Sequence, residues 1–160
     1  MKRPTHTKKS SKGLELVLEL GPTVKLTLQG LTTYDLRHTT VSLDRWVANF
    51  QEALDVPHES YLLKDFCGSD FFKRKSGLSA ETIYHKTLEG DPEGADLFVE
   101  YGSHVGALIA NLERLLQPTA ITLKGPMAKT FDAWGHAMGK ARKQHLGKKP
   151  TVKITVIVSS

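Results

Sequence analysis

The spacing of apolar residues predicts helices in the middle of the chain. Ser79 is a favourable N-cap residue, and apolar side chains follow it at helical spacing until Gly90, which is expected to end that helix. Asp91 and Pro92 combine an N-cap residue with a first-turn proline, so a new helix begins there. Its apolar stripe consists of Ala95, Phe98, Val99, Gly102, Val105, Gly106, Ile109, Leu112 and Leu116. A helix from Pro92 to Leu116 would be about 37 Å long, so we expect it to be the central packing element.

The pattern after this helix predicts a strand, a third helix and a second strand. The strands are Ala120–Leu123, a short apolar run, and Val152–Val158, which alternates apolar and polar residues. The helix between them is predicted from one apolar face: Met127, Phe131, Trp134, Met138 and Ala141. Such a unit implies parallel strands joined by a right-handed crossover. Because glycine destabilises a helix interior, Gly102 and Gly106 indicate close approach of another backbone, and we expect both to be buried against this strand pair.

The amino-terminal part of the chain alternates in two runs, Leu14–Leu20 and Val24–Leu28. The pattern predicts a β-hairpin with a two-residue turn at Gly21-Pro22, in which glycine takes the first central position. A register symmetric about that turn places Glu19 opposite Lys25.

The following segment predicts one more strand and several helices. Thr32–Val41 is rich in β-branched residues, and Ser42 can cap a helix that ends before Pro57. Tyr61–Phe72 predicts one short helix, or two separated at Cys67-Gly68-Ser69. Antiparallel strands, then helices, then a β-α-β unit indicate an α/β fold.

Length and composition favour one globular domain. The chain has 160 residues, of which 39% are hydrophobic, and no apolar run approaches the roughly 20 residues that span a bilayer. Cys67 is the only cysteine, so no intrachain disulfide can form, and a reducing cytoplasm is the expected compartment. The amino terminus lacks the apolar segment of a secretory signal.

The positive charge is concentrated at the amino terminus. The net charge is +5, and Lys2, Arg3, Lys8, Lys9 and Lys12 precede any acidic residue. Residues 1–12 therefore form a basic tail, expected to be disordered, and residues 13–160 form the domain. The alternative for the tail is a nonspecific phosphate or nucleic-acid contact, joined by the lysines and arginines near the carboxy terminus.

One long segment resembles a known family. The residues from Ser79 to Phe131 are SAETIYHKTLEGDPEGADLFVEYGSHVGALIANLERLLQPTAITLKGPMAKTF. Their order and spacing resemble the carboxy-terminal lobe of the ROK family (repressors, open reading frames, sugar kinases), and the match extends over roughly residues 60–160. The resemblance implies a ribonuclease-H-like lobe of the actin-like ATPase fold. It further implies descent from a glucokinase-like enzyme that phosphorylates sugars with ATP and Mg²⁺. Relatives have an amino-terminal lobe and a final helix that find no counterpart here, so we expect a truncated or degenerate member.

The resemblance also suggests sugar-binding residues. Family kinases bind sugar hydroxyls with a Glu-x-Gly-His segment after the hairpin, and Asp35-Leu36-Arg37-His38 stands at that place with Arg37 instead of glycine. A later family glutamate aligns with Lys64, an ammonium that only donates hydrogen bonds, and Asp65 beside it is the substitute. Asp35, His38 and Asp65 are thus candidate substrate-binding residues; the alternative is that Asp35 and His38 are ordinary surface residues.

Two further family sites are incomplete in this sequence. A structural zinc needs four cysteine or histidine ligands, and the single cysteine and unpaired histidine spacing predict no zinc. Of the family's two nucleotide-binding turns, the first would fall near Lys12-Gly13-Leu14 and the second at Lys124-Gly125-Pro126, each with one glycine. Lys124 and Gly125 are the candidate nucleotide contacts. A plain strand-to-helix connection is the alternative, and no residue is assigned as catalytic.

Two functional hypotheses remain open. The chain is either the carboxy-terminal lobe of a ROK sugar kinase, inactive in isolation, or a non-enzymatic interaction or regulatory module built on that lobe. In both cases we expect it to self-associate, most simply as a dimer, or to pair with a separately encoded lobe. The expected contact surfaces are the alternating leucines of the hairpin and one side of Val152–Val158.

Overall fold

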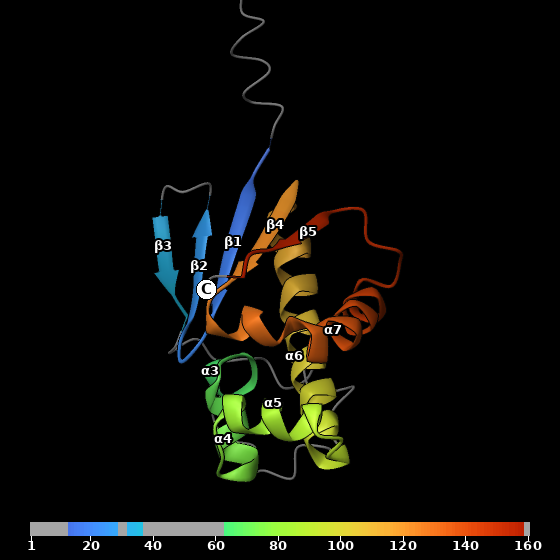
Figure 1. Cartoon of the computed structure of the whole chain (residues 1–160). Coiled ribbons are helices and arrows are strands. Elements are labelled where there is room, and N and C mark those ends of the chain that lie inside the picture. Colours follow the sequence, from blue (N-terminus) through green and yellow to red (C-terminus); the bar gives the residue numbers. More distant parts are fainter. Residues whose placement is uncertain (1–12, 29–31, 37–62, 159–160) are drawn as a thin grey trace, which may run out of the picture.

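A five-stranded sheet in the order β3-β2-β1-β4-β5 forms one part of the molecule (Figure 1). The computed structural model describes residues 13–28, 32–36 and 63–158, and all structural statements concern these residues. The strands are β1 (Glu15–Leu20), β2 (Val24–Leu28), β3 (Thr32–Asp35), β4 (Ala120–Lys124) and β5 (Lys153–Val156). The β1–β2 and β2–β3 pairs are antiparallel, whereas β1–β4 and β4–β5 are parallel. The predicted α/β fold, the hairpin and the parallel pair are confirmed.

The hairpin turn differs from the prediction by one residue. Leu20 pairs with Val24, which leaves three residues in the turn, and the amide of Gly21 donates to the carbonyl of Thr23 over 3.1 Å. Pro22, in the middle of the turn, has no amide hydrogen to donate. The predicted opposition of Glu19 and Lys25 is confirmed.

The helices follow the predicted signals closely. They are α3 (Lys64–Cys67), α4 (Asp70–Ser76), α5 (Ala80–Leu88), α6 (Pro92–Leu116), the 3₁₀ helix η2 (Pro126–Thr130) and α7 (Phe131–Leu146). The hydroxyl of Ser79 accepts from the amide of Thr82, and the carboxylate of Asp91 accepts from the amide of Glu93. Both predicted N-caps and the bounds of α6 are therefore confirmed. The basic tail, the helix expected after Ser42 and the rest of the third-strand segment lie outside the described residues.

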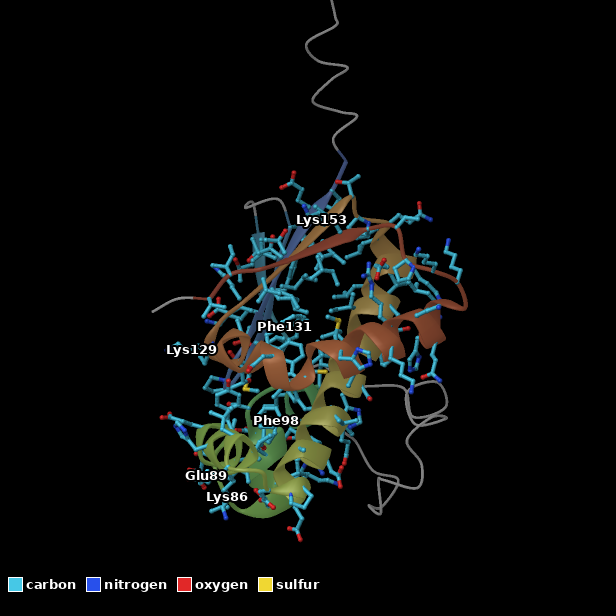
Figure 2. The ribbon with its side chains drawn as sticks, turned by 45° about the vertical axis from the view of Figure 1, so that its right-hand side comes forward. Lys86, Glu89, Phe98, Lys129, Phe131 and Lys153 are labelled. Carbon is cyan, nitrogen blue, oxygen red and sulfur yellow. The ribbon has the colours of Figure 1, made fainter. Side chains whose placement is uncertain are left out.

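One hydrophobic core joins the sheet to α6 and α7. Leu16, Leu18, Leu20 and Leu26 on the hairpin are buried in it, together with Phe98 on α6. Charged side chains such as Lys86, Glu89, Lys129 and Lys153 lie on the outside (Figure 2). The prediction that the hairpin leucines form an exposed contact surface is therefore wrong, because they pack under the helices.

The glycines of α6 approach α7 and not the strands. A Cβ atom on Gly102 would overlap the carbonyl oxygen of Trp134, and one on Gly106 would overlap that of Met138. Both glycines are buried, as predicted, but their expected partner was wrong. The small residues let two helix backbones approach each other, and α7 in turn leads into β5.

Two further properties concern the described residues. Among the described residues, no helix is both long enough and apolar enough to cross a membrane. Cys67 is buried, and its thiol contacts the carbonyl oxygen of His104 at 3.5 Å. Burial raises the pKa of this thiol well above its ordinary value, so the group is an inert part of the core.

Candidate functional site

The carboxyl ends of β1 and β4 meet at one edge of the sheet. The two strands run parallel, with Leu18 beside Leu123 and Glu19 beside Lys124. In open α/β sheets, ligands bind in the crevice outside the carboxyl ends of the strands. A ligand site is therefore expected at the turns that follow these strands.

These two turns are locked together by close contacts. A Cβ atom on Gly21 would lie 3.0 Å from Cδ of Pro126, so only glycine fits there easily. Gly125 has φ +99° and ψ 179°, a backbone conformation that side chains disfavour, and a Cβ there would lie 2.7 Å from the carbonyl oxygen of Leu20. The β1–β2 turn and the β4–η2 turn thus form one compact unit.

A third turn, between α3 and α4, attaches to the same unit. The amide of Ser69 donates to the carbonyl of Gly21 over 2.8 Å. A Cβ on Gly68 would lie 2.7 Å from the carbonyl oxygen of Lys64 and 3.0 Å from that of Gly21. Three glycine-containing turns, distant in the sequence, are therefore fixed against each other at this edge.

A pocket of about 450 Å³ opens beside the three turns. Its walls come from the turns, from η2 and from the start of α5: Pro22, Ser69, Ser79, Ala80, Glu81, Tyr84, His85, Pro126, Met127, Lys129 and Thr130. Most of this lining is apolar or uncharged, and it includes one positive charge, Lys129, and one negative charge, Glu81. The volume falls within the range of small-molecule sites.

Tyr84 is held in place in the wall of this pocket. Its hydroxyl donates to both carboxylate oxygens of Asp132, over 2.8 and 3.0 Å. This hydrogen bond, with smaller contributions from burial and the Asp132 charge, raises the pKa of Tyr84. The phenol therefore stays protonated at neutral pH and presents a fixed aromatic ring.

The outer face of the sheet carries a row of alternating charges near the same edge. Strand register places Asp35, Lys25, Glu19 and Lys124 side by side across β3, β2, β1 and β4. Paired residues project to the same face, so each charge has a neighbour of opposite sign. At about 4.8 Å per strand, Asp35 and Lys124 are roughly 14 Å apart. They share one row but do not form a single contact site.

The predicted site residues fall into separate places. Lys124 and Gly125 stand together at the edge described above, and Asp35 is exposed at the end of β3. Asp65 lies on α3, where its carboxylate pairs with Lys64 at 3.3 Å. His38 lies outside the described residues.

Lys64, which replaces an acid in the resemblance, is bound to acids. Its ammonium also pairs with Asp70 at 3.0 Å. The hydrogen bond from Lys64 to Asp70 is the main cause that raises the lysine pKa, despite partial burial. Lys64 is therefore shared between two neighbouring carboxylates, one on α3 and one on α4.

The structure does not bring the two predicted glycine turns together. Gly13 and Leu14 lie at the amino end of that strand, where the amide of Thr119 donates to the carbonyl of Leu14 over 2.8 Å. Gly125 lies at the opposite, carboxyl edge, beside the turn at Gly21. Gly21 could not be recognised from the sequence pattern, because the predicted parallel pair was β4 with β5, and the parallel pairing of β1 with β4 that brings Gly21 beside Gly125 was not predicted.

Comparison with known proteins places this architecture in a class. Neither a family model nor a curated protein matches the sequence. Among solved structures, the chain is similar to a ROK hexokinase from Thermus thermophilus, with 14% identity and a TM-score of 0.68 over 93% of this chain and 53% of that one. A ROK family glucokinase from Streptomyces griseus, solved with glucose and AMPPNP, matches at 14% identity and a TM-score of 0.66 over 91% of this chain and 55% of that one.

A regulator has the same architecture. A ROK family transcriptional regulator, a homologue of the E. coli MLC protein, matches at 13% identity and a TM-score of 0.66 over 94% of this chain and 43% of that one. The chain thus has the fold of ROK sugar kinases, the actin-like ATPase fold, and the resemblance seen in the sequence is confirmed at that level. It spans about half the length of the solved proteins it matches.

Proposed function

We propose that this chain is the carboxy-terminal, nucleotide-binding lobe of a ROK-type sugar kinase, and that it does not phosphorylate sugars in isolation. The observation that carries the proposal is the pair of locked glycine turns beside a pocket of about 450 Å³ at the carboxyl ends of β1 and β4. The solved glucokinase with the same fold contains glucose and AMPPNP, which makes ATP the nucleotide to test.

The residues at this edge suit the parts of a nucleotide. The turn at Gly125 packs closely on β1 next to this pocket, and lysines lie on both sides of it in the sequence. Lys129 lines the pocket, whereas Lys124 lies beside Glu19 in the strand register and would reach a phosphate from the exposed edge. The apolar pocket with the fixed ring of Tyr84 suits a base. Mg²⁺ is expected to arrive on the phosphates of ATP, since it is commonly held by substrate phosphates and few protein ligands.

The sugar contacts of the proposal are Asp35, His38 and Asp65. Asp35 is exposed and its carboxylate can accept hydrogen bonds from adjacent hydroxyls. Asp65 is available only if a sugar hydroxyl shares its carboxylate with Lys64. Sugar binding therefore rests chiefly on the segment around Asp35.

The lack of turnover follows from what phosphoryl transfer requires. The reaction needs a base, a metal ion and two substrates held in line, and no residue of this chain is assigned as that base. Calorimetric titration with Mg²⁺ and AMPPNP should show saturable binding, while a coupled assay over hexoses and N-acetylhexosamines should show no turnover. Failure to bind AMPPNP would refute the nucleotide site, and turnover that disappears in Asp35→Ala would refute the inactivity.

The second candidate is a regulatory or interaction module. Pro126 opens η2 without an amide donor, which weakens phosphate binding at that helix start, and a ROK regulator shares the fold. Ile157 and Val158 are 49% and 60% exposed and offer an apolar contact for a second copy or a separately encoded lobe. Residues 1–12 would add a nucleic-acid contact, and a cytoplasmic location would suit the reduced cysteine. Sedimentation equilibrium tests self-association. We expect a dimer, and a 17.7 kDa monomer would argue against contact with a second copy.

A further inference from the structure

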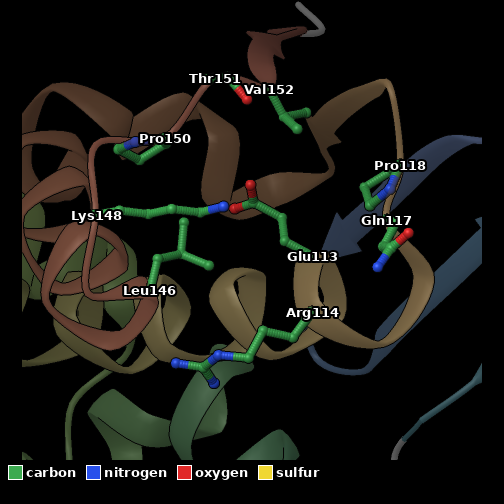
Figure 3. Close-up of a pocket in the computed structure, with 9 residues that line it drawn as sticks. All are labelled: Glu113, Arg114, Gln117, Pro118, Leu146, Lys148, Pro150, Thr151 and Val152. Atoms are coloured by element: carbon green, nitrogen blue, oxygen red, sulfur yellow. The ribbon is translucent and has the colours of Figure 1, made fainter.

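A second pocket lies at the opposite edge of the sheet, next to the amino ends of β4 and β5 (Figure 3). It has a volume of about 660 Å³ and is bordered by the last turns of α6 and α7 and the approach to β5. Its lining residues are Glu113, Arg114, Gln117, Pro118, Leu146, Lys148, Pro150, Thr151 and Val152. The five residues of β4 separate it from the nucleotide edge by about 16 Å.

The only acid in the lining is already neutralised inside the protein. Glu113 is 9% exposed, and its two carboxylate oxygens accept from Nε and Nη2 of Arg142 over 2.5 and 3.0 Å. Arg142 is 8% exposed, and its Nη2 also donates to the carbonyl of Val152 over 2.8 Å. This buried bidentate pair fixes α6, α7 and the start of β5 around the pocket and adds no net charge to it.

The remaining charges of the lining are both positive. Arg114 and Lys148 are exposed. In Figure 3 the ammonium of Lys148 extends toward Glu113, whereas the guanidinium of Arg114 points to the other side of Leu146. The carboxyl ends of α6 and α7 contribute about half a negative charge each. Two full positive charges outweigh them, so the pocket is positive overall. His145 adds nothing at neutral pH, because burial, aided by the Arg114 charge, lowers its pKa.

The rest of the wall is apolar or weakly polar. Pro118, Leu146, Pro150 and Val152 provide carbon surface, and the space exceeds what one phosphate or carboxylate group would fill. Gln117, the one described non-glycine residue with a positive φ, caps α6 at φ +47° and forms part of the rim. A ligand that suits this wall combines an anionic group with a carbon skeleton.

We propose that this pocket binds a small organic anion, with Arg114 and Lys148 contacting its carboxylate or phosphate group and the proline, leucine and valine side chains contacting its carbon skeleton. The site is separate from the proposed nucleotide edge and does not depend on it. The guanidinium of Arg114, whose Nη1 donates to Oδ1 of Asn111 over 3.3 Å, would turn toward the anion to form two parallel hydrogen bonds, and the exposed Lys148 side chain would add a point charge. The Glu113–Arg142 pair holds α6, α7 and the segment before β5 in fixed positions around the pocket.

Titration of the ¹⁵N-labelled full chain, followed by NMR, tests the proposal. Phenyl phosphate and benzoate distinguish the two anionic groups, and inorganic phosphate tests the need for a carbon skeleton. Saturable shifts grouped in residues 113–118 and 146–152, stronger with either organic anion than with inorganic phosphate, are expected. Shifts scattered over the surface, or equal responses to inorganic phosphate, would overturn the proposal.

Two double variants of equal charge provide the matched comparison. Arg114→Gln with Lys148→Gln should weaken binding about tenfold or more, because both charged partners are lost. Lys140→Gln with Lys143→Gln removes the same charge from exposed positions of α7 outside the pocket and should leave the affinity within about twofold. Equal weakening in both proteins would mean a general charge effect and no site. The two proposals can fail independently. NMR shifts at this pocket on addition of an organic anion, without a shift of Gly125 on addition of AMPPNP, would support the anion site and refute the nucleotide site.

Discussion

Gly102 on α6 lies directly against the backbone carbonyl of Trp134 on α7. One turn later, Gly106 lies against Met138, with Ala141 beside it. The buried indole of Trp134 donates to the carbonyl of Met127 over 3.1 Å, so this part of α7 is also tied to η2. The contact between α6 and α7 therefore sets the position of the β4–η2 turn, where the candidate nucleotide site lies.

Adding a side chain at this contact should separate the helices. Gly106→Leu is expected to destabilise the protein by about 1–3 kcal/mol, because its side chain must displace backbone and not merely another side chain. Gly139→Ala on α7 is the control, since a Cβ there meets nothing within 4 Å. That control should stabilise by roughly 0.5–1 kcal/mol through helix propensity. Urea unfolding of both variants measures the difference, and a neutral Gly106→Leu would contradict the close contact.

The bounds of α6 were predictable because each end carries its own local signal. Asp91 and Pro92 start the helix, and Pro118 follows its end, so no tertiary information was needed. The partner of Gly102 was not predictable in this way, because periodicity shows which face is buried and not what covers it. A weak signal for α7 was present in Ala137 and Ala141, which follow one another at helical spacing and lie beside the two glycines.

The candidate site was predicted only in part for a related reason. Gly125 was found because a turn after a strand is visible in the sequence. Gly21 was assigned to an ordinary hairpin, because its contact with Pro126 joins residues that are about 100 positions apart and depends on the β1–β4 pairing. The buried Glu113–Arg142 pair gave no sequence signal at all, since charged residues near helix ends are usually exposed.

Breaking the buried Glu113–Arg142 pair should be costly. Arg142→Met leaves the Glu113 carboxylate buried without its partner, and the expected loss is about 3–5 kcal/mol. Glu113→Leu combined with Arg142→Met should recover much of that loss, because no uncompensated charge remains. Denaturant unfolding of the single and double variants forms a thermodynamic cycle. Additive effects of the two substitutions would contradict a coupled pair.

Stability should fall as the pH is lowered through the titration range of His104. Burial lowers the pKa of this side chain, only partly offset by Glu100, while Arg74 and Lys75 act in the same direction as burial. The imidazole ring of His104 packs against the rings of Phe66 and Phe71, with ring-centroid distances of 5.0 and 5.6 Å. Because the unfolded chain takes up the proton first, the stabilisation is complete above the ordinary pKa of 6.5 and is lost as the pH falls from there toward the folded-state pKa.

Comparing His104→Leu with the unmodified protein isolates this contribution. The free energy of unfolding should fall less steeply in the variant between about pH 7.5 and about pH 5.5. Glu100 acts at lower pH: burial works to raise its pKa, but His104 and Lys75 outweigh burial and lower it from 4.5. Its stabilisation is therefore lost only below that value. Identical slopes for the two proteins in the upper range would exclude His104 as the titrating group.

The last prediction concerns Gly125 at the candidate nucleotide site. Gly125→Ala combines a conformation that L-residues avoid with a clash against the Leu20 carbonyl, so it should destabilise by about 3 kcal/mol and weaken AMPPNP binding by moving the turn. Gly77→Ala is the matched control, because Gly77 also has a positive φ, +79°, but a Cβ there meets nothing within 4 Å. It should cost only about 1 kcal/mol and leave binding unchanged. Unfolding and calorimetric titration, both run below the unfolding temperature of each variant, separate the two effects. Gly125 differs from Gly77 in its contact with β1. Equal changes in AMPPNP affinity in the two variants would show that the turn at Lys124-Gly125-Pro126 is an ordinary connection and not a nucleotide contact.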